Sequence, residues 1–141
     1  MDNLTPEERS NQMRLIRSTD TMPELRVRRL VHGMGYRYRL HRADLPGKPD
    51  LVFPSRRKVI QVNGCYWHGH KCKHGRMPKS SLEYWQNKIA ANQARDKRTL
   101  RQLRRLCWKC LTVWECSLRD ECRLAERIRR FLDRLPNLKG Q

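Results

Sequence analysis

A short hairpin in the first half of the chain constrains the fold most. Asp50-Leu51-Val52-Phe53 and Lys58-Val59-Ile60-Gln61-Val62-Asn63 are rich in apolar and β-branched residues, as strands are. Pro54-Ser55-Arg56-Arg57 between them has the composition of a tight turn. Two strands joined by so short a connection pair antiparallel, so this hairpin predicts a sheet that the other elements must cover.

Helices are predicted on both sides of the hairpin. Thr5-Pro6-Glu7-Glu8 and Thr21-Met22-Pro23-Glu24 each combine an N-cap candidate, an early proline and a capping-box acid. We expect helices at 5–17 and 21–34, a strand at 36–40, a long helix from 80 towards 106, a strand at 107–115 and a helix at 120–135. The last helix would place four apolar residues on one face: Leu124, Ile128, Phe131 and Leu135.

The order of these elements, α-α-β-β-β-α-β-α, predicts an α/β fold with a mixed sheet flanked by helices. No internal repeat or interdomain linker interrupts it, so residues 1–141 are expected to form a single domain. In this interpretation the N-terminal helices span 5–34, the sheet with a metal-binding loop spans 36–116, and the C-terminal helix spans 120–135.

The charge of the chain indicates its partner. Lys and Arg number 32 against 14 acids among 141 residues, a formal net charge of +18. Self-repulsion of this size opposes compaction, so we expect a polyanionic partner, with nucleic acid the leading candidate. The arginines are spread along the chain rather than gathered in a tail, which favours a folded surface that follows phosphates.

Other features predict a cytoplasmic protein. No apolar run approaches the roughly 18 residues of a membrane span, and the start of the chain lacks a secretory signal. Six cysteines in such a context favour metal binding or inert thiols over a disulfide framework.

Asp50 at the start of a strand is a candidate ligand for a divalent cation. Magnesium prefers a few oxygen ligands and retained waters, so one carboxylate and a main-chain carbonyl from the neighbouring strand suffice. A metal there would polarise a phosphate ester. The alternative is that Asp50 only caps the strand, and the Pro49-Asp50 pair alone does not decide between the two.

Cys65-Tyr66-Trp67-His68-Gly69-His70-Lys71-Cys72 has the composition of a zinc loop, with His74 close by. Zinc takes thiolate and imidazole ligands tetrahedrally, and this segment supplies three. Cys116 or the Cys107/Cys110 pair would supply the fourth, and spacing does not say which histidine stays free for catalysis. Cys107-Trp108-Lys109-Cys110 also has the C-x-x-C form of redox sites, but it lies in a strand pattern, which favours structural thiols.

Three aromatic residues near this loop suit nucleic-acid contact. Tyr66 and Trp67 lie inside the polar loop, where at least one ring should be exposed to stack on bases or wedge between them. Trp85 shares helical spacing with Leu82 and Ile89, so a core position is equally consistent with its placement.

Taken together, Pro46-Gly47-Lys48-Pro49-Asp50, Gly64-Cys65-Tyr66-Trp67-His68 and Val113-Trp114-Glu115-Cys116 resemble the motifs of the very short patch repair endonuclease family. The similarity runs from about Asn11 to Leu118. It implies a restriction-endonuclease-like fold with a structural zinc site. The implied substrate is double-stranded DNA with a T·G mismatch left by 5-methylcytosine deamination, nicked by a magnesium-dependent monomer that is nucleoid-associated in bacteria and works with mismatch-repair proteins.

The resemblance also implies roles for single residues. Asp50 matches the metal-binding catalytic aspartate and Val62 the residue that lends magnesium its main-chain carbonyl. His68 matches the catalytic histidine and Asp96 the acid that orients it, while Glu24 matches a position near the active site. The implied zinc ligands are Cys65, His70, Cys72 and Cys116. The implied DNA contacts are Met13 and the wedge residues Tyr66, Trp67 and Trp85.

The sequence departs from the family in three places. Val62 stands where a threonine can occur, Tyr66 replaces a phenylalanine, and Gln61 and Asn63 are uncharged where related nucleases carry a second carboxylate. The last difference leaves the number of magnesium ions open. Two other functions fit the same residues: a zinc-containing DNA-binding protein without catalysis, and a nuclease that acts on fully paired DNA.

Overall fold

The computed structural model describes residues 21–40, 42–65, 68, 70 and 82–134. The helix expected at 5–17 and the residues after 134 lie outside these ranges. The described elements are, in chain order, α2 (Met22–Gly33), β1 (Arg39–Leu40), β2 (Leu51–Phe53), the 3₁₀ turn η1 (Pro54–Arg56), β3 (Lys58–Asn63), α3 (Leu82–Arg105), β4 (Lys109–Trp114), the 3₁₀ segment η3 (Glu115–Arg119) and α4 (Glu121–Asp133).

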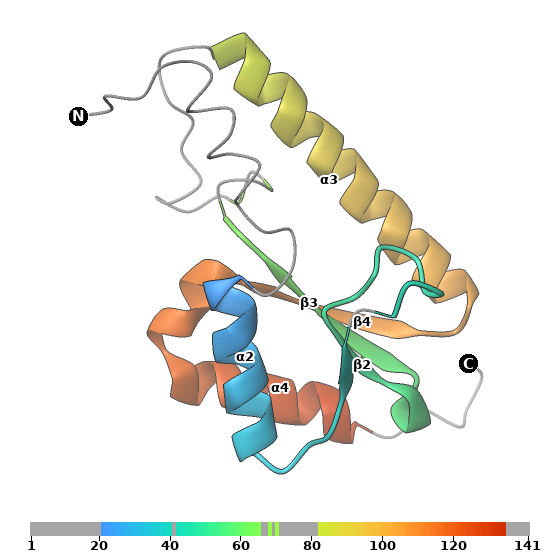
Figure 1. Cartoon of the computed structure of the whole chain (residues 1–141), viewed down its shortest axis with the longest axis vertical. Helices are drawn as coiled ribbons and strands as arrows, with labels where there is room; N and C mark the ends of the chain where they lie inside the picture. Colours follow the sequence, from blue (N-terminus) through green and yellow to red (C-terminus); the bar gives the residue numbers. More distant parts are fainter. Residues whose placement is uncertain (1–20, 41, 66–67, 69, 71–81, 135–141) are drawn as a thin grey trace.

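Within the described residues, four strands form one mixed sheet in the order β1-β2-β3-β4. The β1–β2 and β2–β3 pairs are antiparallel, and the β3–β4 pair is parallel with Val62 beside Val113. Parallel neighbours need a long crossover, which includes α3. Figure 1 shows α3 on one side of the sheet and α2 with α4 on the other. The prediction of a mixed sheet flanked by helices is therefore confirmed.

Local signals in the sequence set most of the element boundaries. The Thr21 hydroxyl accepts a hydrogen bond from the N–H of Glu24 at 3.4 Å, as an N-cap should. Asp120 caps α4 in the same way through the N–H of Arg123 at 3.1 Å. The hairpin between β2 and β3 turns through η1 and Arg57, whose φ of 53° places it in the left-handed region.

The strand expected at 36–40 is shorter than predicted. Only Arg39 and Leu40 belong to β1, because the ladder with β2 ends where Arg39 pairs with Val52. Tyr36 and Tyr38 instead tie the chain to the helices. The Tyr36 hydroxyl donates to Asp133 at 2.8 Å and the Tyr38 hydroxyl donates to the Arg28 carbonyl at 3.2 Å.

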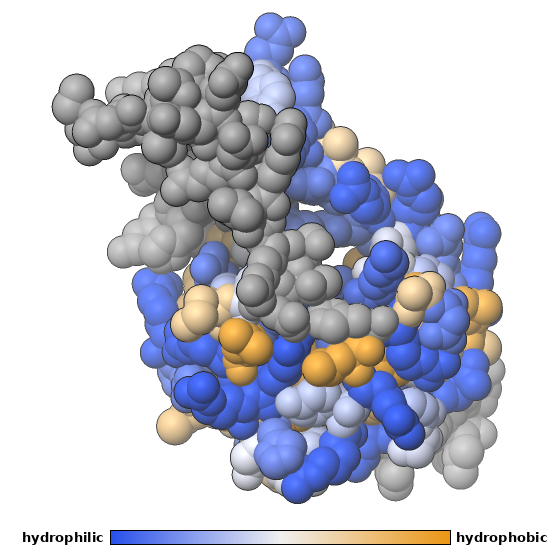
Figure 2. All heavy atoms as spheres, in the orientation of Figure 1, coloured by the Kyte–Doolittle hydropathy of each residue, from blue (hydrophilic) through white to orange (hydrophobic). Residues whose placement is uncertain are grey.

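The chain has little apolar surface to bury. Its mean hydropathy is −0.92, and hydrophilic side chains cover most of the visible described surface in Figure 2. None of the described helices is long and apolar enough to cross a membrane. Stability must therefore come from a small number of well-buried positions.

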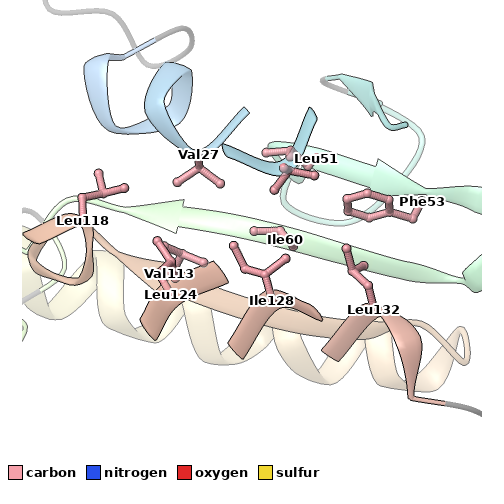
Figure 3. Packing of buried hydrophobic residues seen from close by; sticks show 10 residues of the cluster. Val27, Leu51, Phe53, Ile60, Val113, Leu118, Leu124, Ile128 and Leu132 are labelled. Carbon is pink, nitrogen blue, oxygen red and sulfur yellow. The ribbon is translucent and has the colours of Figure 1, made fainter. Parts of the chain in front are cut away.

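The main core lies between the sheet and the α2/α4 layer (Figure 3). Leu124 and Ile128 of α4 lie one helical turn apart and are almost fully buried, with Leu132 one turn further on. Each such side chain contributes about 1.5–3 kcal/mol by leaving water. The opposing members of this core are Val27, Val31, Leu51, Phe53, Ile60, Val113 and Leu118. Leu135, which was expected on the same face of α4, lies outside the described residues.

A second, smaller cluster lies on the α3 side of the sheet. Leu45, Val52, Val59 and Leu103 form it, and Trp108 and Cys110 pack at its edge. Side chains alternate between the faces of a strand, so Asp50, two residues before Val52, also belongs to this side. By the same rule, Gln61 and Thr112 follow Val59 and Cys110 there. On this face, therefore, the apolar side chains lie at one end of the strands and the polar side chains of Asp50, Gln61 and Thr112 lie at the other end.

Candidate active site and metal site

Asp50 lies directly before β2, next to the main chain of β3. Its Oδ2 accepts a hydrogen bond from the N–H of Val62 at 2.6 Å. In a strand, the N–H and C=O of one residue point to the same neighbouring side. The Val62 carbonyl therefore lies on the side of β3 that Asp50 occupies. A carboxylate and a carbonyl are hard oxygen donors, and this pair fits magnesium. The same bond also ends the β2–β3 ladder, so Asp50 has a structural role as well.

His68 is held by α3. Its Nδ1 lies 2.6 Å from Oδ2 of Asp96, and both side chains are partly exposed. The side-chain amide of Gln93 donates to the His68 carbonyl at 3.3 Å, and the His68 N–H bonds to the Gly64 carbonyl at 3.3 Å. An imidazole whose Nδ1 is held by a carboxylate keeps its other nitrogen for proton transfer. Gln93 is not among the candidates that the sequence motifs indicate. Its signal was the i,i+3 spacing to Asp96 on one helix face.

Cys110 of β4 carries a largely buried thiol at the edge of the α3-side cluster. Burial, together with smaller contributions from the negative charges of Asp50 and Asp96, raises the pKa of this thiol to about 12, while hydrogen bonds with Thr112 and the Gln61 main chain act in the opposite direction. Both carboxylates thus act on the same thiol of β4. Such a thiol stays protonated at neutral pH, which opposes both the redox interpretation of the C-x-x-C sequence and metal ligation by Cys110.

A second cluster lies beyond the ends of β3 and β4. The ligand atoms of Cys65, His70 and Cys116 all lie within 4.8 Å of one another. The His70 N–H donates to the Cys65 carbonyl at 2.9 Å, and the His70 ring stacks on Trp114 at 4.2 Å. Two sulfurs and one imidazole nitrogen are the donor set that zinc prefers. The sequence left the distant ligand open between Cys116 and the Cys107/Cys110 pair, and the structure places Cys116 at this cluster.

The remaining candidate residues are placed only in part. Glu24 is 4% exposed in the first turn of α2, with Arg28 at 3.3 Å. Trp85 is half-buried on α3, with its ring edge-on to Tyr84 at 5.1 Å. Four candidates lie outside the described residues: Met13, Tyr66, Trp67 and Cys72.

Gly47 holds the loop that leads to Asp50 against α3. Its φ is +75°, and a Cβ at this position would lie 2.4 Å from Cγ2 of Thr99, whose side chain is buried. The same Cβ would lie 3.2 Å from Nε2 of Gln61. Both the backbone conformation and the close approach therefore require glycine. This contact fixes the distance between α3, which carries Asp96, and the loop, which carries Asp50.

Gly47→Ala is expected to destabilise the fold and to slow catalysis. The left-handed backbone and the overlap with Thr99 together cost about 1–3 kcal/mol of unfolding free energy. Urea denaturation and DNA nicking measure the two effects. Gly35→Ala measures the cost of the left-handed backbone alone, because Gly35 has φ +98° and open space around it. Gly33 has neither a positive φ nor a close neighbour, so Gly33→Ala measures the baseline effect of replacing a glycine by alanine. Equal stability losses for Gly47→Ala and Gly35→Ala would refute the close-contact argument.

Cys116→Ser is expected to lower both the zinc content and the melting temperature. Loss of a ligand removes part of the metal-binding free energy, which is also folding free energy. A loss of a few kcal/mol corresponds to roughly 5–15 °C in a domain of this size. Cys122→Ser is the matched control, because Cys122 is an exposed free thiol on α4. Elemental analysis and thermal melting check both variants, and an unchanged metal content in Cys116→Ser would rule out this ligand.

The fold by itself defines a class. The structure is similar to the catalytic domain of the homing endonuclease I-Bth0305I, with a TM-score of 0.54 at 22% identity over 79% of this chain and 94% of that one. At this identity the likeness concerns the fold alone. This chain therefore shares its arrangement of sheet and helices with that domain, which agrees with the architecture expected from the sequence.

The sequence then gives the family. Residues 1–74 match the family model of the DNA mismatch endonuclease Vsr, and the chain belongs to this family. It is 53% identical over 132 residues to the type II nicking enzyme V.XorIIP of Xanthomonas oryzae pv. oryzae, covering 94% of this chain and 97% of that protein. It is 42% identical over 118 residues to the DNA mismatch endonuclease Vsr of Escherichia coli, covering 84% of this chain and 76% of that protein. The chain is thus a DNA endonuclease of the Vsr family.

Proposed function

We propose that this endonuclease nicks double-stranded DNA next to the T of a T·G mismatch left by 5-methylcytosine deamination, and so initiates very short patch repair. One observation carries the proposal: the Asp50 carboxylate bonds to the main chain of Val62, and the Asp96 carboxylate of α3 holds the ring of His68. The E. coli relative, a DNA mismatch endonuclease, supports the choice of substrate.

The chemistry divides among a few residues. Asp50 and the Val62 carbonyl would hold magnesium, and the bound ion would supply Lewis-acid polarisation of the scissile phosphate and stabilise developing negative charge. Asp96 holds His68 through Nδ1, so the Nε2 of His68 takes a proton from the attacking water. Glu24 completes the proposed catalytic set through its match to the family.

Mismatch recognition is assigned to the loop and to aromatic side chains. Cys65, His70, Cys72 and Cys116 would hold zinc, which would tie the loop to the end of the sheet. The rings of Tyr66, Trp67 and Trp85 insert beside the mismatch, and Met13 contacts the DNA. Opening a base step costs a few kcal/mol, and less where the pair is already mismatched, so insertion favours the damaged step.

The test compares duplexes of identical sequence that carry either T·G or T·A at one position, with and without magnesium. We expect magnesium-dependent nicking of the T strand of the T·G duplex. Its rate should exceed that of the paired duplex by at least about 100-fold, which corresponds to a difference of about 3 kcal/mol in the cost of opening the mismatched and the paired base step. Trp67→Ala should reduce this ratio towards one. Nicking of neither duplex would favour the non-catalytic zinc protein.

Nicking of paired DNA is the second candidate function. The similarity to V.XorIIP, a type II nicking enzyme, favours including it in the same assay. A panel of duplexes with different flanking bases separates the two candidates, because a mismatch enzyme requires T·G in every productive context. Equal rates on matched and mismatched duplexes would overturn the mismatch proposal.

A further inference from the structure

A basic groove lies at the start of β4, and Cys110 is among the residues that line it. It encloses about 620 Å³ between the start of β4, the end of α3 and the C-terminal half of α4, and Trp108 and Phe131 contribute to its walls. Its lining has six basic side chains and, among the described residues, no acidic one. The basic residues are Lys58, Arg104, Lys109, Arg127, Arg130 and Arg134.

Two of these cations are accounted for by the fold. The Lys58 ammonium donates to the carbonyls of Phe131 at 2.6 Å, Leu132 at 3.2 Å and Arg134 at 2.7 Å. It thereby satisfies the last carbonyls of α4, which have no partner within the helix. Arg130 is paired with Glu126 at 3.2 Å.

The other four cations are not held by contacts of this kind. Arg104, Lys109, Arg127 and Arg134 form no ion pair with an acid of the described residues. β4 is an edge strand, and a lysine on an edge opposes pairing with another chain, which explains Lys109. Protection of a strand edge does not explain the arginines of the groove, because Arg104 belongs to α3, Arg127 to α4, and Arg134 follows α4.

Further positive charge lies close to the same walls. The Arg57 guanidinium lies 5.3 Å from the centre of the Trp108 ring. Like charges on a concave surface repel one another and focus the field outwards, which raises the local concentration of anions. The charge of the groove lining is therefore complementary to that of an anionic ligand.

We propose that this groove binds backbone phosphates of the DNA duplex outside the cleaved step. Three of the four unpaired cations are arginines, whose planar forks match phosphate oxygens. Thr112 lies beside Gln61, the residue before Val62 in the candidate active site. Lys109 lies three residues before Thr112, which is roughly 10 Å along the strand, or about three nucleotide steps of a DNA strand. Phosphates near the cut are thus close enough to reach it. The proposal requires a DNA endonuclease but not T·G specificity.

The experiment measures the binding of a fully paired duplex of about three helical turns by fluorescence anisotropy, without divalent cations, over a range of salt concentrations. Each phosphate contact contributes about −0.9 to the slope of log K against log salt. Arg104→Gln/Arg127→Gln should therefore lower the magnitude of the slope by about two, equally on paired and T·G duplexes. Lys109→Gln/Arg134→Gln provides a second pair if the first fails to fold.

The matched control is Arg29→Gln/Arg123→Gln, which removes the same charge from exposed positions of α2 and α4 outside the groove. It should leave the slope unchanged. Equal slopes for the wild type and the groove variants would overturn the proposal, as would equal losses in groove and control variants. Polyglutamate is the second probe: loss of its binding with an unchanged DNA slope would assign the groove to an acidic polypeptide instead. Since no cleavage is measured, a failure of T·G nicking does not affect this result.

Discussion

Asp50→Asn is expected to lower the nicking rate by about 1,000-fold or more, which corresponds to about 4 kcal/mol of transition-state stabilisation. Asparagine preserves the size of the side chain. It also keeps an oxygen that can accept the hydrogen bond from the Val62 N–H, which in the wild type joins Val62 N to Asp50 Oδ2 at 2.6 Å. It removes the charge that holds a divalent cation. Binding of a T·G duplex should change little, because one neutralised acid does not weaken phosphate contacts. Single-turnover nicking and anisotropy measure the two quantities separately.

Asp44→Asn is the control for this prediction. Asp44 lies in the same connecting segment, pairs with Arg42, and has a side chain that is 60% exposed. The chemical change is the same, but the residue lies on the surface, so nicking should stay at the wild-type rate. A wild-type rate for Asp50→Asn, or an equal loss in Asp44→Asn, would remove Asp50 from the proposed mechanism.

His68→Ala is expected to lower the nicking rate by about 100- to 10,000-fold, the usual contribution of a general base. Asp96→Asn should cost less, because the imidazole remains and loses only the bond at its Nδ1, now 2.6 Å long. The double variant should be no slower than His68→Ala alone, since Asp96 acts through His68. Single-turnover rates at saturating magnesium complete this double-mutant cycle.

Two further variants sharpen the cycle. His32→Ala removes an exposed histidine of α2 and should leave the rate unchanged. Gln93→Ala removes the amide that bonds to the His68 carbonyl and should give a loss smaller than that of Asp96→Asn. Additive losses from His68→Ala and Asp96→Asn would show that Asp96 acts by a separate route.

Several parts of the candidate site still rest on the sequence alone. Met13, Tyr66, Trp67 and Cys72 lie outside the described residues, so their roles in wedging DNA or binding zinc stay predictions. The catalytic roles of Asp50, His68, Asp96 and Glu24 are likewise proposals. Family membership and the nuclease fold do not depend on them.

Local patterns predicted local structure well. Thr21 and Asp120 mark the starts of α2 and α4, since a side chain that caps a helix bonds within three residues of itself. The hairpin at 50–63 was likewise readable, because its apolar runs and turn are neighbours in the chain. The strand at 36–40 was overestimated for the opposite reason: its length depends on where β2 ends, which is not a property of that segment.

The amino-acid sequence by itself determined the kinds of elements, their order, the basic charge and the residue types capable of metal and proton chemistry. These follow from propensities, spacing and composition, which act over a few residues. Only the tertiary structure decided that Asp50 bonds to the main chain of Val62, that Cys116 joins Cys65 and His70, and that Gly47 meets Thr99. Those contacts depend on strand register and on the packing of α3 against the sheet, and both are set by burial over the whole domain.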